Sequence, residues 1–265
     1  MTENYVQMSG GKVWYTIHRN ADTAAKTIVF THGLTADSTM FEKQVEYFEK
    51  EYTLILWDVP CHGRSREYSN FTYRETAEAL NAILEQENIA GAVLAGMSMG
   101  GYPCQFFADM YPEKVLGFVG IDTTPLGKGY YSSGDIFWLK QVEWMAACFP
   151  EKLLKYSMAR SVSVSDFSYN KMMEIMGRSS KKEISRQMGI AYGQFIKENR
   201  DIEFDFPFII LVGDKDSTGK VKQYCHKWHE NTGRPLYIIE NARHFSNGDN
   251  PQQVNSIIDS FIKSL

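Results

Sequence analysis

A serine with a glycine two residues before it and another two residues after it stands in the stretch Gly96-Met97-Ser98-Met99-Gly100. A serine hydroxyl is a weak nucleophile on its own, and it attacks a carbonyl carbon only when a base takes its proton. Glycines on both sides leave room for a sharp turn in which the backbone passes close to itself. The spacing indicates an exposed serine at the apex of such a turn, and the chemistry it favours is acyl transfer.

The residues around this turn predict a strand before it and a helix after it. Residues 91–95 are small or apolar, as in a buried strand, and residues 102–111 are helix-like and end before Pro112. A helix that begins just after the serine directs its free N–H groups and its positive dipole end toward the same place. From the pattern alone, a glycine-rich turn without a catalytic role remains the alternative.

Similar apolar runs recur along the chain, with helix-like segments between them. Strands are expected at residues 12–18, 27–30, 53–57, 115–121, 208–212 and 236–239, and helices at residues 39–50, 72–88 and from Pro251 onward. This alternation predicts a mostly parallel, doubly wound sheet, in which only the first of these strands is antiparallel. Ligands bind beyond the carboxyl ends of such strands, where His32, Asp58, Ser98 and Asp122 stand.

The alternation stops after Pro125. Residues 126–200 show no convincing strand and predict helices at 136–148, 151–159, 166–176 and 181–197. We interpret residues 126–200 as a helical cap inserted into a core domain of residues 1–125 and 201–265. The cap is rich in methionine and aromatic residues. We expect most of these to pack the cap onto the core and a few to line an apolar, adaptable cavity.

Composition excludes several classes of protein. The chain has 265 residues, 43% of them hydrophobic, and a net charge of −4, which argues against binding to nucleic acid. No apolar run is long enough to insert across a membrane, and residues 1–10 do not resemble a secretory signal. The four cysteines are widely spaced, as in a reduced protein. We expect a cytoplasmic monomer or homodimer.

Five short motifs, taken in order, resemble those of the α/β-hydrolase superfamily. They are His32-Gly33, Asp58-x-Pro-x-His-Gly-Arg-Ser65, Gly96-x-Ser98-x-Gly100-Gly101, Gly213-Asp-Lys-Asp216 and His244-Phe245. The resemblance covers nearly the whole chain and is weakest in the proposed cap, the variable part of that family. It implies the α/β-hydrolase fold, with an eight-stranded, mostly parallel sheet and an inserted helical cap.

The resemblance also implies a role for individual residues. Ser98 corresponds to the nucleophile, His244 to the general base, and Asp216 to the acid that orients His244. The backbone N–H groups of Leu34 and Met99 correspond to the oxyanion hole.

The assignment of the acid has two alternatives. Family members usually carry a proline shortly after the acid, whereas Asp216 is followed by Ser-Thr-Gly, so Asp214 remains a candidate. Asp122, at the end of the strand after the nucleophile helix, is the third. We favour Asp216, because it lies farther past the strand end and can reach His244. Asp214 then holds its own turn, and Asp122 anchors the exit into the cap.

Other polar residues have simpler interpretations. Cys225-His226-x-x-His229 resembles metal-ligand spacing, but a solvated helix face explains it better, since a closed site needs three or four ligands. His32, His62 and Asp58 are expected to form structural hydrogen bonds. No phosphate-binding loop or hydride-cofactor motif occurs. We therefore expect neither a metal nor an organic cofactor.

These observations favour hydrolysis of a small carboxylic ester, lactone or thioester through an acyl-enzyme on Ser98. The substrate is expected to be small and apolar or of the acyl type. Residues 126–200 hold 12 Lys and Arg against 7 Asp and Glu. This surplus favours an anionic or carrier-bound substrate, although a solvated helix surface is the simpler explanation.

Two alternatives stay open: cleavage of a C–C bond or acyl transfer at the same triad, and a ligand receptor or signalling partner with slow turnover. Haloalkane dehalogenases and epoxide hydrolases are disfavoured, because they place aspartate where Ser98 stands.

Overall fold

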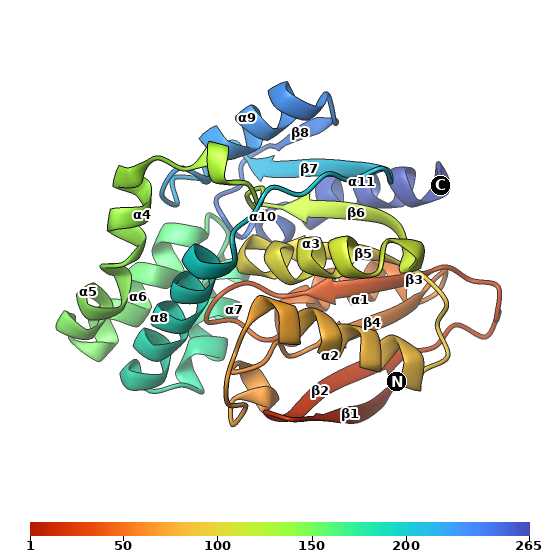
Figure 1. The fold of residues 1–265 in the computed structure, drawn as a ribbon, viewed down its shortest axis with the longest axis horizontal. Helices are drawn as coiled ribbons and strands as arrows, with labels where there is room; N and C mark the ends of the chain where they lie inside the picture. Colours follow the sequence, from red (N-terminus) through yellow and green to blue (C-terminus); the bar gives the residue numbers. More distant parts are fainter.

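The computed structural model describes residues 1–265 and contains one eight-stranded sheet (Figure 1). The strands are β1 (Thr2–Met8), β2 (Gly11–His18), β3 (Thr27–Thr31), β4 (Thr53–Trp57), β5 (Ala92–Met97), β6 (Val115–Ile121), β7 (Phe208–Gly213) and β8 (Leu236–Ile239). Their spatial order is β1-β2-β4-β3-β5-β6-β7-β8. β2 pairs antiparallel with β1 and β4, and all other pairs are parallel. The expected α/β-hydrolase fold is confirmed.

Helices cover both faces of the sheet. One face packs against α2 (Tyr73–Gln86), α3 (Gly101–Met110) and α9 (Val221–Thr232), and the other against α1 (Glu42–Phe48) and α11 (Pro251–Lys263). Successive strand residues alternate between the two layers, so that Ile28 and Phe30 belong to one core and Val29 to the other. Short elements complete the chain: α10 (Ser246–Asp249) and the 3-10 turns η1 (Ser38–Phe41), η2 (Gly63–Ser65), η3 (Ser98–Gly100), η4 (Pro112–Lys114) and η5 (Lys128–Tyr130).

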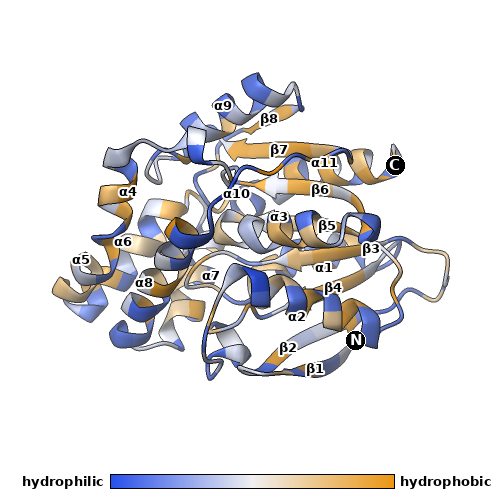
Figure 2. Cartoon of the chain, viewed as in Figure 1, coloured by the Kyte–Doolittle hydropathy of each residue, from blue (hydrophilic) through white to orange (hydrophobic).

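Five helices connect β6 to β7: α4 (Ser133–Leu139), α5 (Val142–Cys148), α6 (Glu151–Val162), α7 (Asp166–Gly177) and α8 (Lys181–Glu198). They lie beyond the carboxyl ends of the parallel strands (Figure 1), at the edge where the sequence places its polar candidates. Figure 2 shows apolar strands in the middle of the sheet and mixed hydropathy on these helices. The division into a core of residues 1–125 and 201–265 and a cap of residues 126–200 stays a prediction, because it concerns independent folding and motion.

Two elements differ from the sequence-based expectation. β1 was not expected, because it is an edge strand in which only Val6 is buried and which therefore lacks a clear apolar alternation. The helix expected over residues 136–148 is wrong, since the chain forms α4 and α5 with a break at Lys140–Gln141. α4 begins earlier than expected because Ser132 and Asp135 form a capping box.

The helices also bear on membrane insertion. None of them combines the length and the apolar composition that crossing a bilayer requires.

Candidate active site

Ser98 lies at the apex of a strained turn between β5 and α3. Its φ is +52°, in the left-handed region that residues with a side chain rarely adopt. A β-carbon on Gly96 would lie 2.6 Å from the carbonyl oxygen of Gly100, and one on Gly100 would lie 2.1 Å from the carbonyl oxygen of Thr31. Only glycine fits these two positions, so the spacing that singled out Ser98 in the sequence is a steric requirement of the turn.

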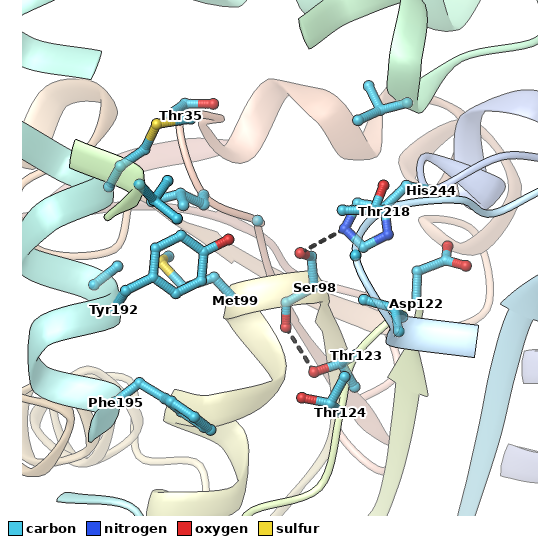
Figure 3. Close-up of a pocket in the computed structure, with 18 of the residues that line it drawn as sticks. Thr35, Ser98, Met99, Asp122, Thr123, Thr124, Tyr192, Phe195, Thr218 and His244 are labelled. Carbon is cyan, nitrogen blue, oxygen red and sulfur yellow. Dashed lines mark hydrogen bonds between the residues drawn. The ribbon is translucent and has the colours of Figure 1, made fainter. Parts of the chain in front are cut away.

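The structure brings Ser98, His244 and Asp216 into one chain of hydrogen bonds. The Oγ of Ser98 lies 2.7 Å from Nε2 of His244 (Figure 3), and Nδ1 of His244 lies 2.8 Å from Oδ2 of Asp216. The backbone N–H of Thr218 donates to the other oxygen of Asp216 at 2.8 Å, which fixes the carboxylate. With Nδ1–H donating to Asp216, Nε2 is left free to accept the proton of Ser98.

Charge and burial have opposite effects on the pKa values of His244 and Asp216. Burial acts to lower the pKa of His244, but the charge and hydrogen bond of Asp216 and the charge of Asp122 together raise it above the usual histidine value. Burial acts to raise the pKa of Asp216, yet His244 and the Thr218 groups hold it below the usual range. The site therefore favours an imidazolium beside an ionised Asp216, which is the charge distribution that proton transfer from Ser98 creates.

We expect activity to fall on the acid side of a raised histidine pKa. Only neutral His244 can accept a proton, so kcat/KM should be constant at high pH and should decline as the pH drops through a value above the usual histidine pKa of about 6.5. A pH–rate profile measures this limb. Asp214→Asn, which removes a carboxylate that makes no contact with His244, should leave the limb in place. An acid limb below the usual value would contradict the argument.

The carboxylates of the two alternative acids are held by other partners, although Asp122 lies close to Asp216 and His244. Asp122 is fully buried and accepts hydrogen bonds from the backbone N–H of Gly213 at 2.8 Å and from the N–H and hydroxyl of Ser246. Burial, with the nearby charge of Asp216, raises the pKa of Asp122 to about 7. Asp214 accepts from the backbone N–H of Ala242 at 3.0 Å. Neither carboxylate makes a hydrogen bond to His244.

The expectation for Asp122 needs a correction in detail. The sequence suggested that it anchors the chain leaving for the cap, whereas its carboxylate ties the end of β6 to β7 and to Ser246, two residues after His244. Asp122 therefore supports the loop that carries His244.

The loop after β3 lies directly behind Ser98. A β-carbon on Gly33 would lie 3.3 Å from the β-carbon of Ser98, so the backbone at Gly33 passes close to the Ser98 side chain. Leu34 and Met99 both line the same cavity as Ser98. The side chain of His32 is buried in hydrogen bonds to the Gly33 carbonyl and the Val59 N–H, as expected of a structural residue. Leu34 and Met99 therefore border the cavity beside Ser98, and their role as oxyanion donors remains a proposal.

Residues beside this loop also form structural contacts. Asp58 accepts from the backbone N–H groups of Ser38 and Arg64 and from the guanidinium of Arg64. His62 is buried against the Pro60 carbonyl, and burial lowers its pKa to about 3. Neither side chain faces Ser98.

Ser98 and His244 open onto a cavity of about 690 Å³ under the helices that follow β6. Its walls are mainly apolar and come from the β3 loop, the helices α4–α8 and the start of α9. The methionine and aromatic side chains of residues 126–200 differ in exposure more than expected. Met176 is buried, as expected of a packing residue, and Met172 is buried and lines the cavity, whereas Trp138 and Trp144 are more than half exposed. Trp138 also lines the cavity.

Two residues near Ser98 were missed in the sequence. Thr123 donates its hydroxyl to the carbonyl oxygen of Ser98 at 2.6 Å and so braces the turn (Figure 3). Tyr192 of α8 directs its hydroxyl into the cavity toward Ser98 (Figure 3). The signal for Tyr192 was its spacing from Met188 and Phe195, which puts the three on one helix face, and all three line the cavity.

Candidate metal ligands are engaged in other contacts. Asp122, Asp216 and His244 bring ligand atoms within 4.8 Å of one another, but these atoms already carry the hydrogen bonds described above. Cys225 is buried and donates to the Thr123 carbonyl, and Nδ1 of His229 contacts the Arg234 carbonyl. The Cys225 cluster therefore does not converge on one point.

The order of the strands is that of an α/β-hydrolase sheet. A serine at a strained strand-to-helix turn and a histidine after the last strand are typical of the same fold. A sequence profile described as "alpha/beta hydrolase fold" matches residues 26–251. The chain belongs to this family, and it is a hydrolase.

Individual relatives are more distant. The chain is 24% identical to the mouse sn-1-specific diacylglycerol lipase ABHD11 over 92% of its own length and 83% of the relative's. It is 33% identical to 3-oxoadipate enol-lactonase 1 of Acinetobacter baylyi, over 32% of each chain. Among solved structures, an esterase from Exiguobacterium antarcticum superposes with a TM-score of 0.81 at 17% identity, covering 98% of both chains. At this identity the structural likeness shows the fold alone.

Proposed function

We propose that this protein hydrolyses a carboxylic ester, lactone or thioester through a covalent acyl-enzyme on Ser98. The observation that carries the proposal is the continuous hydrogen-bonded chain from Ser98 through His244 to Asp216, which opens onto an apolar cavity. In this arrangement Ser98 is the nucleophile, His244 the general base, and Asp216 the acid that holds the imidazole in one tautomer.

The reaction has two halves. In the first, His244 takes the proton of Ser98 as Oγ attacks the carbonyl carbon, and the oxyanion faces the N–H groups of Leu34 and Met99. The C–O or C–S bond then breaks, and the proton on His244 passes to the leaving alcohol or thiol. In the second half, His244 takes a proton from water, which attacks the acyl carbon and releases the acid, and Ser98 regains its proton.

The cavity supports a substrate with an apolar acyl part. Its lining is mostly apolar, with methionines that adapt to chains of different shape. Two relatives are named for substrates of this chemistry, a diacylglycerol lipase and an enol-lactonase, and another is a pimeloyl-[acyl-carrier protein] methyl ester esterase. Each name describes that relative. For this chain they support the ester and lactone class.

Burst kinetics with p-nitrophenyl esters of increasing chain length test the proposal. We expect a rapid release of p-nitrophenol, equal to the enzyme concentration, followed by steady turnover, because the acyl-enzyme forms faster than it hydrolyses. A burst without steady turnover would favour the slow receptor. Turnover that appears only when an alcohol acceptor is added would favour acyl transfer. The absence of both phases with every ester would contradict the proposal.

Trp138→Ala should change chain-length preference more than stability. Trp138 lines the cavity while its side chain is 62% exposed, so its removal enlarges the cavity and leaves the cores intact. Relative kcat/KM values should therefore shift among esters of different length, while the melting temperature stays close to that of the wild type. Trp144→Ala, which replaces an exposed tryptophan outside the cavity, is the matched control. Equal losses on all esters would count against contact of Trp138 with substrate.

A further inference from the structure

The helices α4, α5 and α6 carry an unusual share of the exposed apolar surface. Large exposed hydrophobic side chains are concentrated between residues 137 and 164, which hold eight of fifteen in the chain: Phe137, Trp138, Trp144, Met145, Phe149, Leu153, Tyr156 and Val164. Scattered single exposures are normal on a protein surface, whereas exposed apolar side chains gathered on consecutive helices beside a cavity call for an explanation. We call the first seven of these residues the aromatic face.

The aromatic face is continuous with the cavity above Ser98. Trp138 and Met145 belong to both, since each is exposed and each lines the cavity. Leu139 and Val142, between them in the sequence, line the cavity as well. The α4–α6 end of the molecule lies beyond the carboxyl ends of the strands (Figure 1), so a partner bound there meets the route to Ser98.

Positive charge accompanies this apolar surface. Lys140 and Lys152 are exposed on the same segment and form no salt bridge, and Arg160 follows Tyr156 by one helical turn on α6. The glutamates of the segment are Glu143 and Glu151, and Glu151 is paired with Lys155. Residues 126–200 carry a net charge of +5, whereas the rest of the chain, with 16 Lys and Arg and 25 Asp and Glu, carries −9. The positive charge is thus concentrated in the part of the chain that includes the aromatic face, and between residues 137 and 164 four Lys and Arg stand against two Asp and Glu.

We propose that the aromatic face docks on a lipid surface that contains anionic headgroups, and that the cavity takes its acyl substrate from that surface. Tryptophan and tyrosine prefer the boundary between headgroups and acyl chains, because each has an apolar ring and a polar atom. Lysines beside them gain from the negative potential of the surface. No helix spans the bilayer in this arrangement, so the protein lies on the membrane.

A second copy of the chain is the alternative occupant, and two features disfavour it. A symmetric dimer through this face would bring two copies of the same positively charged surface together. It would also cover Trp138 and Met145, and with them the entrance of the cavity. A lipid surface has neither disadvantage.

Vesicle co-sedimentation tests the proposal independently of catalysis. The full chain with Ser98→Ala is mixed with vesicles of phosphatidylcholine and phosphatidylglycerol, and with vesicles of phosphatidylcholine alone. We expect binding that is stronger to the anionic vesicles and weaker at high salt. The double variant Trp144→Ser/Leu153→Ser should bind about tenfold more weakly, because interfacial affinity scales with buried apolar area. Neither of these residues lines the cavity.

The matched control is Tyr47→Ser/Tyr237→Ser, which removes two exposed aromatic side chains from outside the aromatic face. It should bind vesicles as the unsubstituted chain does. In the active protein, both double variants should retain turnover of p-nitrophenyl acetate, and only Trp144→Ser/Leu153→Ser should lose activity on a long-chain ester embedded in vesicles. Equal vesicle binding by all chains, or a dimer in gel filtration that Trp144→Ser/Leu153→Ser converts to monomer, would overturn the proposal.

Discussion

Replacing Ser98 by alanine is expected to lower kcat by roughly 10⁶-fold, the scale of loss that follows removal of the nucleophile in a serine protease triad. The hydroxyl of Ser98 is the group that hydrogen-bonds to His244 at Nε2. The nearby hydroxyl of Thr123 donates to the Ser98 carbonyl and cannot replace it as nucleophile. Hydrolysis that remains would come from general binding and from water activated by His244.

The folded structure should tolerate this change. Alanine keeps the β-carbon that already fits at a φ of +52°, so only the hydrogen bond to His244 is lost. Thermal unfolding should therefore remain close to that of the wild type. A fluorophosphonate probe should label the wild type at Ser98 and leave Ser98→Ala unlabelled. A well-folded variant that keeps a substantial part of its esterase activity, or that still reacts with the probe, would remove Ser98 as nucleophile.

The sheet could be predicted from the sequence because burial on both faces demands continuous apolar strands, as at Thr53–Trp57 and Val115–Ile121. The position of Ser98 could be predicted because its turn admits only glycine at Gly96 and Gly100. Both are local constraints. β1 could not be predicted, since an edge strand that buries only Val6 leaves almost no periodic signal.

The long-range partners of the site were harder to predict. That Asp122 receives hydrogen bonds from Gly213 and Ser246 depends on the packing of β6 against β7 and on the path of a distant loop. The place of Tyr192 depends on how α8 lies over the cavity. Neither arrangement is encoded by neighbouring residues. Local sequence therefore locates each strand end, and the tertiary fold decides which side chains meet there.

Asp216→Asn is expected to lower kcat by about 10⁴-fold, the loss that an aspartate-to-asparagine change causes in the worked serine protease triad. The carboxylate of Asp216 accepts the Nδ1–H of His244 at 2.8 Å. An asparagine of the same shape can turn its NH₂ group toward the ring, and the ring then carries its proton on Nε2, where it can no longer accept one from Ser98. The variant also loses the negative charge that helps to raise the pKa of His244, so the acid limb of its pH–rate profile should move to lower pH.

Two further aspartates provide matched controls, because the same isosteric change is made at each. Asp122→Asn keeps an oxygen for the Gly213 N–H and disturbs only the bonds to Ser246, so it should cost some stability and far less activity than Asp216→Asn. Asp214→Asn should cost little, because an amide oxygen can still accept the Ala242 N–H. Steady-state kinetics on one ester, with thermal unfolding of each variant, rank the three. If Asp122→Asn is the crippling change and Asp216→Asn is mild, the working acid lies at the end of β6, and the observed contact of Asp216 with His244 is structural.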